Sequence, residues 1–298
     1  MSLFAKRLKS LNPRRLKGRR WLFVPYDQLS DRIGPLSRED PGSLGIVLVE
    51  SRWKPSLRKY HKQKLALVLA NMRHFALEQA ARGVAVRYVF SDKSYSKALQ
   101  PVIDELGPLE MMTPAERELR VELSGRIEDD GIRLLAHEGW LTQRAQLLAS
   151  AGDQPPWRMD RFYRHVRKDS GILMQDGKPE GGKYSFDAAN RKPWNGEPKA
   201  PQPVRFTPDA VTLEVGELVE TAFADHPGRL DLSTLPATAD DAGRLWRHAL
   251  EHCMEQFGPY EDAMSARSGG LFHTRIAPLL NLHRLLPRQV VDDVLDGG

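Results

Sequence analysis

Residues 271–282 of this 298-residue chain combine the side chains best suited to binding an anion. They read Leu-Phe-His-Thr-Arg-Ile-Ala-Pro-Leu-Leu-Asn-Leu, so that a histidine, a hydroxyl and an arginine precede an apolar run. This order is typical of a helix start, where the first backbone N–H groups lack partners and the helix dipole favours negative charge. The pattern predicts a phosphate-binding segment, with ordinary helix capping as the alternative. Its candidate ligands are His273, Thr274, Arg275 and Asn281.

The first half of the chain alternates short apolar runs with longer amphipathic ones. Residues 21–26 and 45–50 are mostly apolar without alternation, as in strands that are covered on both faces, and a third run spans residues 84–90. Between them, residues 60–82 show helical spacing and end at Gly83. This alternation predicts an α/β fold with a parallel, doubly wound sheet.

Polar side chains stand where the first two predicted strands end. Asp27 and Gln28 follow the first strand, and Glu50 ends the second. Ligands of doubly wound sheets lie at the carboxyl ends of the strands, so we expect a nucleotide-like ligand there, although Asp27 also suits a turn. The chain has no G-x-G-x-x-G after the first strand and no P-loop, which argues against a dinucleotide dehydrogenase or a nucleotide kinase.

The rest of the first half continues the same alternation. Residues 94–106 read as a helix, and residues 109–112 and 131–136 read as strands. Between those strands, Thr113 and Glu116 have the spacing of a capping box, with a proline at the first helical position. A helix is therefore expected to begin there.

The second half is predicted to be helical after a long connector. Residues 157–168 form an amphipathic helix, and a segment rich in Gly, Pro and Lys follows it from Gly171 to about Pro203. Helices are expected at residues 207–223, at 238–256 and from Pro287 onward. The predicted division is a basic tail at 1–20, an α/β domain at 21–150, a connector at 151–205 and the start of an all-helical domain at 206–298.

Basic side chains of the connector could face nucleic acid. Five of them lie on the predicted helix or in the lysine-rich loop and are candidates for a surface that faces phosphate groups: Arg158, Arg161, Lys183, Arg191 and Lys192. Such residues would neutralise phosphate charge and make binding sensitive to salt. The alternative is a solvated helix face and a lysine-rich loop.

The net charge of +5 comes from the amino terminus. Eight of the 44 Lys and Arg residues lie within residues 1–20, which contain no Asp or Glu, so the remainder carries −3. Such an arm could contact nucleic acid or an anionic surface, or could be a solvated tail. Cys253 is the single cysteine, which excludes a disulfide framework and a cysteine-ligated metal or iron–sulfur site within this chain. No apolar run reaches the length of a membrane span, and we expect a cytoplasmic monomer.

Several motifs together resemble the photolyase-related proteins of the cryptochrome/photolyase superfamily, in the prokaryotic (6-4) photolyase branch. They occur in order and cover roughly residues 20–298. The matching segments are Asp27-Gln28-Leu29, residues 61–64 and 72–75, residues 157–164, residues 181–187 and 190–192, and residues 271–282.

The resemblance implies a flavoprotein that repairs ultraviolet-damaged DNA with light, after the lesion is flipped out of the duplex. It implies an antenna-type α/β domain, a long connector and a helical FAD domain. Tyr260 joins His273, Thr274, Arg275 and Asn281 as an FAD-binding residue on this resemblance. Family members continue well beyond the length of this chain, so we expect a truncated form that is inactive alone.

The resemblance also implies a lumazine-type antenna pigment near Asp27, Gln28 and Glu50. Family members carry an acidic residue four positions after the strand-end Glu, and this chain has Lys54 there. An ammonium reverses the charge and removes the acceptor, which argues against that pigment. Two other hypotheses stay open: a non-catalytic pigment- or nucleotide-binding module with a scaffold or signalling role, and a hydrolase or transferase. No Ser/His/Asp, Cys/His or paired-carboxylate arrangement supports the last.

Overall fold

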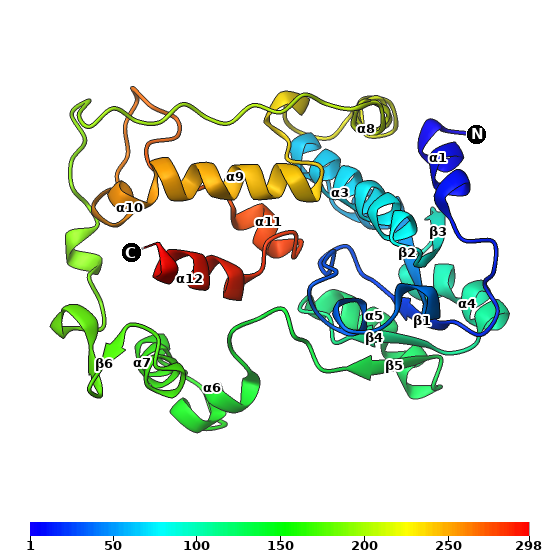
Figure 1. The fold of residues 1–298 in the computed structure, drawn as a ribbon, viewed down its shortest axis with the longest axis horizontal. Helices are drawn as coiled ribbons and strands as arrows, with labels where there is room; N and C mark the ends of the chain where they lie inside the picture. Colours follow the sequence, from blue (N-terminus) through cyan, green and yellow to red (C-terminus); the bar gives the residue numbers. More distant parts are fainter. Residues whose placement is uncertain (298) are drawn as a thin grey trace. The chain divides into compact units, whose positions relative to one another are not determined.

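The computed structural model of the protein describes residues 1–297, which form two compact units. The first unit comprises Met1–Gly139, Pro203–His248 and the residues from Arg275 onward. The second comprises Trp140–Gln202 and Ala249–Thr274. Each unit is therefore assembled from segments that are separated along the chain, which Figure 1 shows by colour.

A five-stranded sheet forms the centre of the first unit (Figure 1). Its strands lie in the order β3-β2-β1-β4-β5, and every pairing between them is parallel. The order reverses at β1, so the doubly wound α/β sheet predicted from the sequence is confirmed. The strands are β1 (Arg20–Phe23), β2 (Leu44–Ser51), β3 (Ala85–Ser91), β4 (Leu109–Met112) and β5 (Ile132–Leu135).

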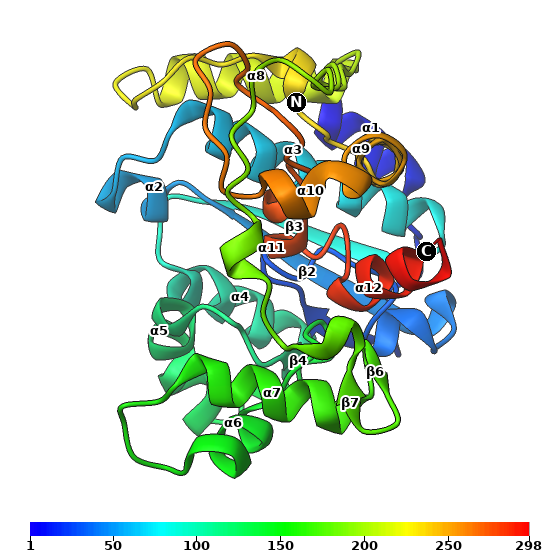
Figure 2. The same cartoon turned by 90° about the vertical axis from the view of Figure 1, so that its left-hand side faces the viewer.

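Helices cover both faces of this sheet (Figure 2). On one face, α3 (Lys62–Ala81) packs with α1 (Leu3–Leu11) and α8 (Ala210–Ala222), and the other face carries α4 (Tyr95–Leu106) and α5 (Arg117–Glu128). No helix within residues 1–297 is long and apolar enough to cross a lipid bilayer. The other helices of the unit are α2 (Trp53–Leu57), α9 (Ala239–His252, whose last residues belong to the second unit), α11 (Ala277–Asn281) and α12 (Pro287–Asp296).

Alternate side chains of β1 supply the two layers of the core. Trp21 and Phe23 pack against α4 and α5, whereas Leu22 packs against α3. Successive side chains of a strand point to opposite faces, so an apolar residue at every position produces this arrangement. Gly45 of β2 pairs with Trp21, and only glycine fits there because a Cβ atom would come within 2.5 Å of the Trp21 ring.

The second unit is mainly helical. Arg167 fixes the turn after α7: its Nε donates to the carbonyl of Ile172 at 2.8 Å, and the helix ends at Gly171 with a φ of 69°. The helix expected at 157–168 thus runs two residues later than predicted. The elements are α6 (Arg144–Ala151), α7 (Met159–Ser170), the antiparallel pair β6 (Met174–Gln175) and β7 (Lys178–Pro179), and α10 (Met254–Tyr260).

Two predicted helix starts are wrong. Thr113 does not cap α5, because its hydroxyl donates to the carbonyl of Leu135 at 3.0 Å and the helix begins at Arg117. The helix expected near Thr274 begins at Ala277, since Arg275 has a left-handed φ of 59° that interrupts helical geometry.

The basic amino terminus is folded rather than a solvated tail. Phe4 and Leu8 of α1 are buried in the core, and the Phe4 ring packs edge-on against Tyr88 with 4.7 Å between centroids. After the helix, the Asn12 side chain accepts from the N–H of Val86 at 2.8 Å and donates to its carbonyl at 2.9 Å. The helix escaped sequence prediction because its apolar face contains few residues and needs distant partners.

Truncating Phe4 tests whether α1 is part of the core. We expect Phe4→Ala to lower the free energy of unfolding by about 3 kcal/mol, since it removes a fully buried ring. Leu3→Ala is the control, because Leu3 is 47% exposed and its truncation should change stability by less than ~0.5 kcal/mol. Denaturant titration measures both variants, and equal stability would show that α1 packs only loosely.

Candidate functional site

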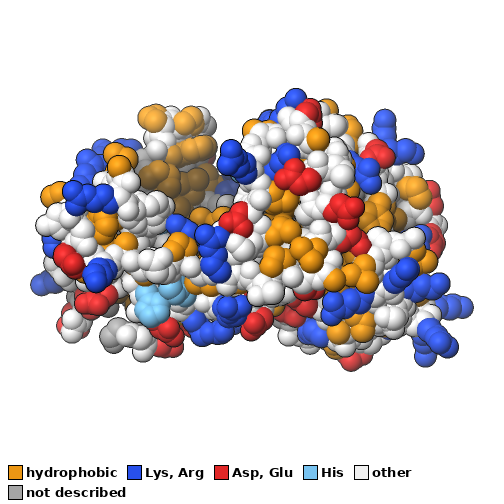
Figure 3. Space-filling model, turned by 90° about the horizontal axis from the view of Figure 1, so that it is seen from above, with side chains coloured by type: hydrophobic (Ala, Val, Ile, Leu, Met, Phe, Trp, Pro, Cys, Tyr) orange, Lys and Arg blue, Asp and Glu red, His pale blue; other side chains and the backbone are white. Residues whose placement is uncertain are grey.

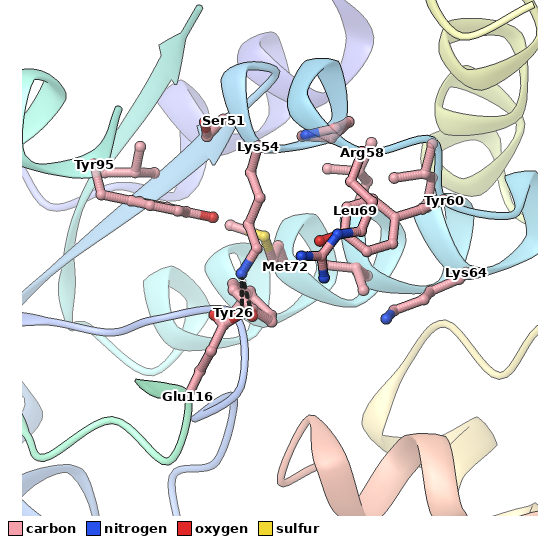
Figure 4. Close-up of a pocket in the computed structure, with 14 residues that line it drawn as sticks. Tyr26, Ser51, Lys54, Arg58, Tyr60, Lys64, Leu69, Met72, Tyr95 and Glu116 are labelled. Carbon is pink, nitrogen blue, oxygen red and sulfur yellow. Dashed lines mark hydrogen bonds and ion pairs between the residues drawn. The ribbon is translucent and has the colours of Figure 1, made fainter. Parts of the chain in front are cut away.

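A cavity of about 180 Å³ lies at the carboxyl ends of β1 and β2 (Figure 4). This is where doubly wound sheets bind ligands. Tyr26 lines it after β1, Ser51 at the end of β2 and Tyr95 at the start of α4. Leu65, Val68, Leu69 and Met72 of α3 contribute apolar surface, and the other lining residues are Val49, Lys54, Pro55, Arg58, Tyr60, Lys64 and Glu116.

Lys54 crosses this cavity and contacts its polar wall. Its ammonium donates to the hydroxyl of Tyr26 at 2.9 Å and forms an ion pair with Glu116, and Tyr26 also donates to Glu116 (Figure 4). The Lys54 nitrogen lies 4.9 Å from the centroid of the Tyr26 ring. Burial and the hydrogen bond to Glu116 raise the pKa of Tyr26 well above its usual value, so its hydroxyl stays protonated. The three side chains form a closed polar cluster.

The side chains that line the cavity suit the binding of a planar ligand better than the catalysis of a reaction. Aromatic rings and apolar side chains line most of it, together with the ion pair of Lys54 and Glu116 and the basic side chains of Arg58 and Lys64. A mainly apolar lining with a few polar groups is the usual composition of a small-molecule site. The volume is below the roughly 300–1,000 Å³ of such sites, so a ring system would enter only if Lys54 moved. A second hollow of about 370 Å³ between α2 and α5 shares Lys54, Arg58, Tyr60 and Tyr95.

The residues predicted at the strand ends lie beside the cavity rather than in its lining. Gln28 is buried and donates to the carbonyl of Met112 at 3.0 Å, which joins the β1 loop to β4. Asp27 is 7% exposed, and no donor within residues 1–297 reaches its Oδ1. Burial raises the pKa of Asp27 to about 6, despite a hydrogen bond from its own backbone and the nearby charge of Lys54.

Glu50 is occupied by a structural ion pair. The Arg73 guanidinium donates to its two oxygens at 2.9 and 2.8 Å, and the Tyr88 hydroxyl donates to it at 2.6 Å. Both charged side chains are almost completely buried. Glu50 therefore connects β2 to α3. The residues that line the cavity were not predicted from the sequence as a site. Lys54 was considered only as a replacement for an acidic residue, and Glu116 only as part of a capping box.

The predicted flavin-binding residues fall into both units. In the second unit, Tyr260 is buried with its ring 5.2 Å from that of Phe272, His273 is exposed and Thr274 is half-buried. In the first unit, Arg275 and Asn281 are exposed.

The helix start in this segment does not suit an anionic ligand. The helix α11 has only five residues and begins after Ile276, which gives no side-chain cap. A helix this short presents little dipole, so any phosphate binding here would depend on side chains.

All five predicted DNA-facing residues are exposed in the second unit. Arg158 pairs with Asp160 at 3.2 Å and Arg191 with Asp262 at 3.1 Å, whereas Lys183 lies 4.5 Å from the centroid of Phe186. On the face drawn in Figure 3, Lys and Arg side chains stand singly or in small groups with acidic ones among them. These cations are accessible, but carboxylates partly compensate them.

A groove of about 940 Å³ in the second unit runs along α7 and the loop that follows it. Its aromatic side chains, Tyr163, Tyr184 and Phe186, could stack on planar groups. Arg164 and Arg167 lie 5.6 and 5.7 Å from the centroid of Tyr184. The groove lies in the region predicted to contact nucleic acid, but none of the five predicted DNA-facing residues lines it.

The pKa of Asp27 predicts a pH-dependent stability. Because it is raised from 3.8 to about 6, the buried carboxylate destabilises the fold above pH 6, and this cost disappears as the pH falls through 6 toward 3.8. Asp27→Asn should therefore raise the free energy of unfolding by about 2 kcal/mol at pH 7 and by much less at pH 4. Denaturant titration at both values measures this, with Asp92→Asn as an exposed control. A constant difference between the two pH values would refute the assignment.

Comparison with known proteins identifies the family. The family model of deoxyribodipyrimidine photo-lyase-related proteins matches residues 22–234, which include strands β2 to β5, the second half of β1, and α7. The chain is 31% identical over 264 residues to a protein of Agrobacterium fabrum (strain C58) named (6-4) photolyase. That alignment covers 86% of this chain and 52% of the relative, so the chain spans about half the length of the curated protein it matches. The resemblance inferred from the motifs is confirmed, and the chain belongs to the photolyase-related protein family.

Proposed function

We propose that the protein is a photolyase-like flavoprotein that acts in light-driven repair of DNA. The observation that carries the proposal is the family match over residues 22–234. The relative's name, (6-4) photolyase, supports a photolyase activity and damaged DNA as the partner. The exposed basic residues and the aromatic groove of the second unit are compatible with a nucleic-acid partner.

FAD is the proposed cofactor, and its phosphates are the groups that the segment at 271–282 would bind. His273 and Arg275 offer exposed donors, Thr274 offers a hydroxyl and Asn281 an amide. Arg275 is the best candidate because a guanidinium binds phosphate with two parallel hydrogen bonds. FAD would supply the photochemistry, and the role of these side chains would be to bind and orient it.

Replacing Arg275 tests the cofactor proposal. We expect the unmodified chain to bind FAD and Arg275→Gln to bind it 10- to 100-fold more weakly, which corresponds to a lost charged hydrogen bond of about 1.5–3 kcal/mol. Titration of flavin fluorescence gives the affinities. The control is Arg288→Gln, because Arg288 is an exposed arginine of α12 that pairs with Asp292 at 3.7 Å. Equal affinity of the two variants, or no flavin binding by the unmodified chain, would contradict the proposal.

The strand-end cavity supports a second candidate function, a pigment- or nucleotide-binding module. The observation that favours it is the aromatic and apolar lining around Lys54. If a lumazine-type pigment binds there, the ion pair between Lys54 and Glu116 competes with it, because the pair occupies the polar wall. The wild-type cavity should therefore bind a neutral ligand weakly.

Removing Lys54 tests this competition. We expect Lys54→Ala to bind ribityl-lumazine at least ~10-fold more tightly than the unmodified chain, since the cavity enlarges and Glu116 becomes an available acceptor. Lys59→Ala serves as the control, because Lys59 pairs with Asp225 at 2.8 Å and lies outside the cavity lining. Fluorescence titration with ribityl-lumazine and with FAD measures both ligands. A variant that binds no better than the control would rule out the competition.

A further inference from the structure

The folded amino terminus carries a dense group of exposed cations. Residues 1–20 contain eight basic side chains and no acidic one. Three of the eight are used within the fold: Arg7 lies 3.7 Å from Asp209, Arg19 donates to main-chain carbonyls, and Arg20 pairs with Glu39 and Glu110. The other five, Lys6, Lys9, Arg14, Arg15 and Lys17, are exposed, and we call them the N-terminal basic surface.

These five cations are available to a partner. Within residues 1–297, no carboxylate forms an ion pair with any of them. Elsewhere in the first unit, some exposed cations have acidic partners, such as Arg87 with Glu105 at 2.7 Å and Lys59 with Asp225 at 2.8 Å, and others, such as Lys93 and Lys97, form no ion pair within residues 1–297. The N-terminal basic surface differs from these scattered positions because its five cations lie within residues 6–17, a stretch that contains no Asp or Glu.

The backbone that carries these cations is fixed on the first unit. Glu214 of α8 accepts from the N–H groups of Leu3 at 2.6 Å and Phe4 at 3.3 Å, which anchors the start of α1. At the other end, one nitrogen of Arg19 donates to the carbonyls of Pro41, Leu44 and Gly83 at 2.7–3.1 Å. Because the segment between is held at both ends, binding there costs less ordering entropy than binding by a free tail.

We propose that the N-terminal basic surface binds the phosphate backbone of duplex DNA without reading its sequence. Closely spaced cations that lack acidic neighbours match a polyanion, and counterion release supplies the affinity. An anionic membrane fits less well, since insertion needs an apolar helix face and Phe4 and Leu8 of α1 are already buried. The choice of DNA rests on the proposed function, although the surface itself does not.

A triple variant tests the surface. Lys6→Gln/Lys9→Gln/Lys17→Gln removes three of the five charges, and the 298-residue chain is titrated with undamaged duplex DNA at several salt concentrations. Each lost phosphate contact reduces the slope of log K against log salt by about 0.9, so we expect a slope shallower by about 2.7. Between 50 and 200 mM salt this amounts to roughly 40-fold less loss of affinity than in the unmodified chain.

The matched control is Lys59→Gln/Arg87→Gln/Arg288→Gln, which loses the same charge from exposed, ion-paired positions. If both triple variants change the slope equally, only the net charge matters and the surface is refuted. Tighter binding to phosphatidylserine vesicles than to DNA would also overturn the proposal, and this arm is needed because Leu11 and Leu16 are partly exposed. Circular dichroism verifies that both variants remain folded.

FAD titration of the same proteins separates this inference from the proposed function. If the chain binds flavin but the triple variant has no specific effect on the salt slope, only the proposal for the N-terminal basic surface is refuted. A shallower slope in a chain that binds no FAD would support the surface and refute the flavoprotein proposal. We expect both flavin binding and the slope change.

Discussion

The buried guanidinium of Arg73 connects four elements of the first unit. It donates to Glu50 of β2 at 2.9 and 2.8 Å and to Glu214 of α8 at 2.8 Å, and Glu214 accepts from the N–H of Leu3 at the start of α1. Burial alone would lower the pKa of Arg73, but the hydrogen bond and charge of Glu50 raise it, so the cation persists. Removing it would leave Glu50 buried without a counterion, a change that costs about 3–5 kcal/mol in other proteins. Arg73 of α3 thus connects the sheet and α8 directly, and α1 through Glu214.

The fold was predictable where the pattern is local. The apolar runs around Trp21 and Ile46 indicated strands covered on both faces, and both lie at the centre of the sheet. The helix expected from residue 238 begins at Ala239, and the Thr238 hydroxyl accepts from the N–H of Asp241 at 3.0 Å. The helix α1 was not predictable in this way, because burial of Phe4 depends on contacts with Tyr88 and Arg73. The predicted domain boundaries at 150 and 205 follow changes in composition along the chain. The two compact units are instead each made of segments that alternate along the sequence.

The candidate site was predictable in place but not in composition. The strand-end rule located the cavity correctly, because parallel topology brings the ends of β1 and β2 to one edge of the sheet. The side chains that line it come from separate elements: Lys54 and Glu116 are 62 positions apart, and Tyr26 and Glu116 are 90 apart. Such pairs leave no local pattern. Glu50 was predicted to bind a ligand because it ends a strand, but in the structure it forms a buried ion pair with Arg73.

The side-chain amide of Asn12 affects how readily two copies of the protein could associate through their sheets. β3 is the outermost strand on its side of the sheet, and the amide both accepts from and donates to the main chain of Val86. It thereby satisfies, at Val86, two of the main-chain groups that an incoming strand would use. Open strand edges are templates for aggregation, and natural proteins protect them by covering or interrupting them. Asn12, the residue after α1, therefore blocks this position of the β3 edge against pairing with a second copy.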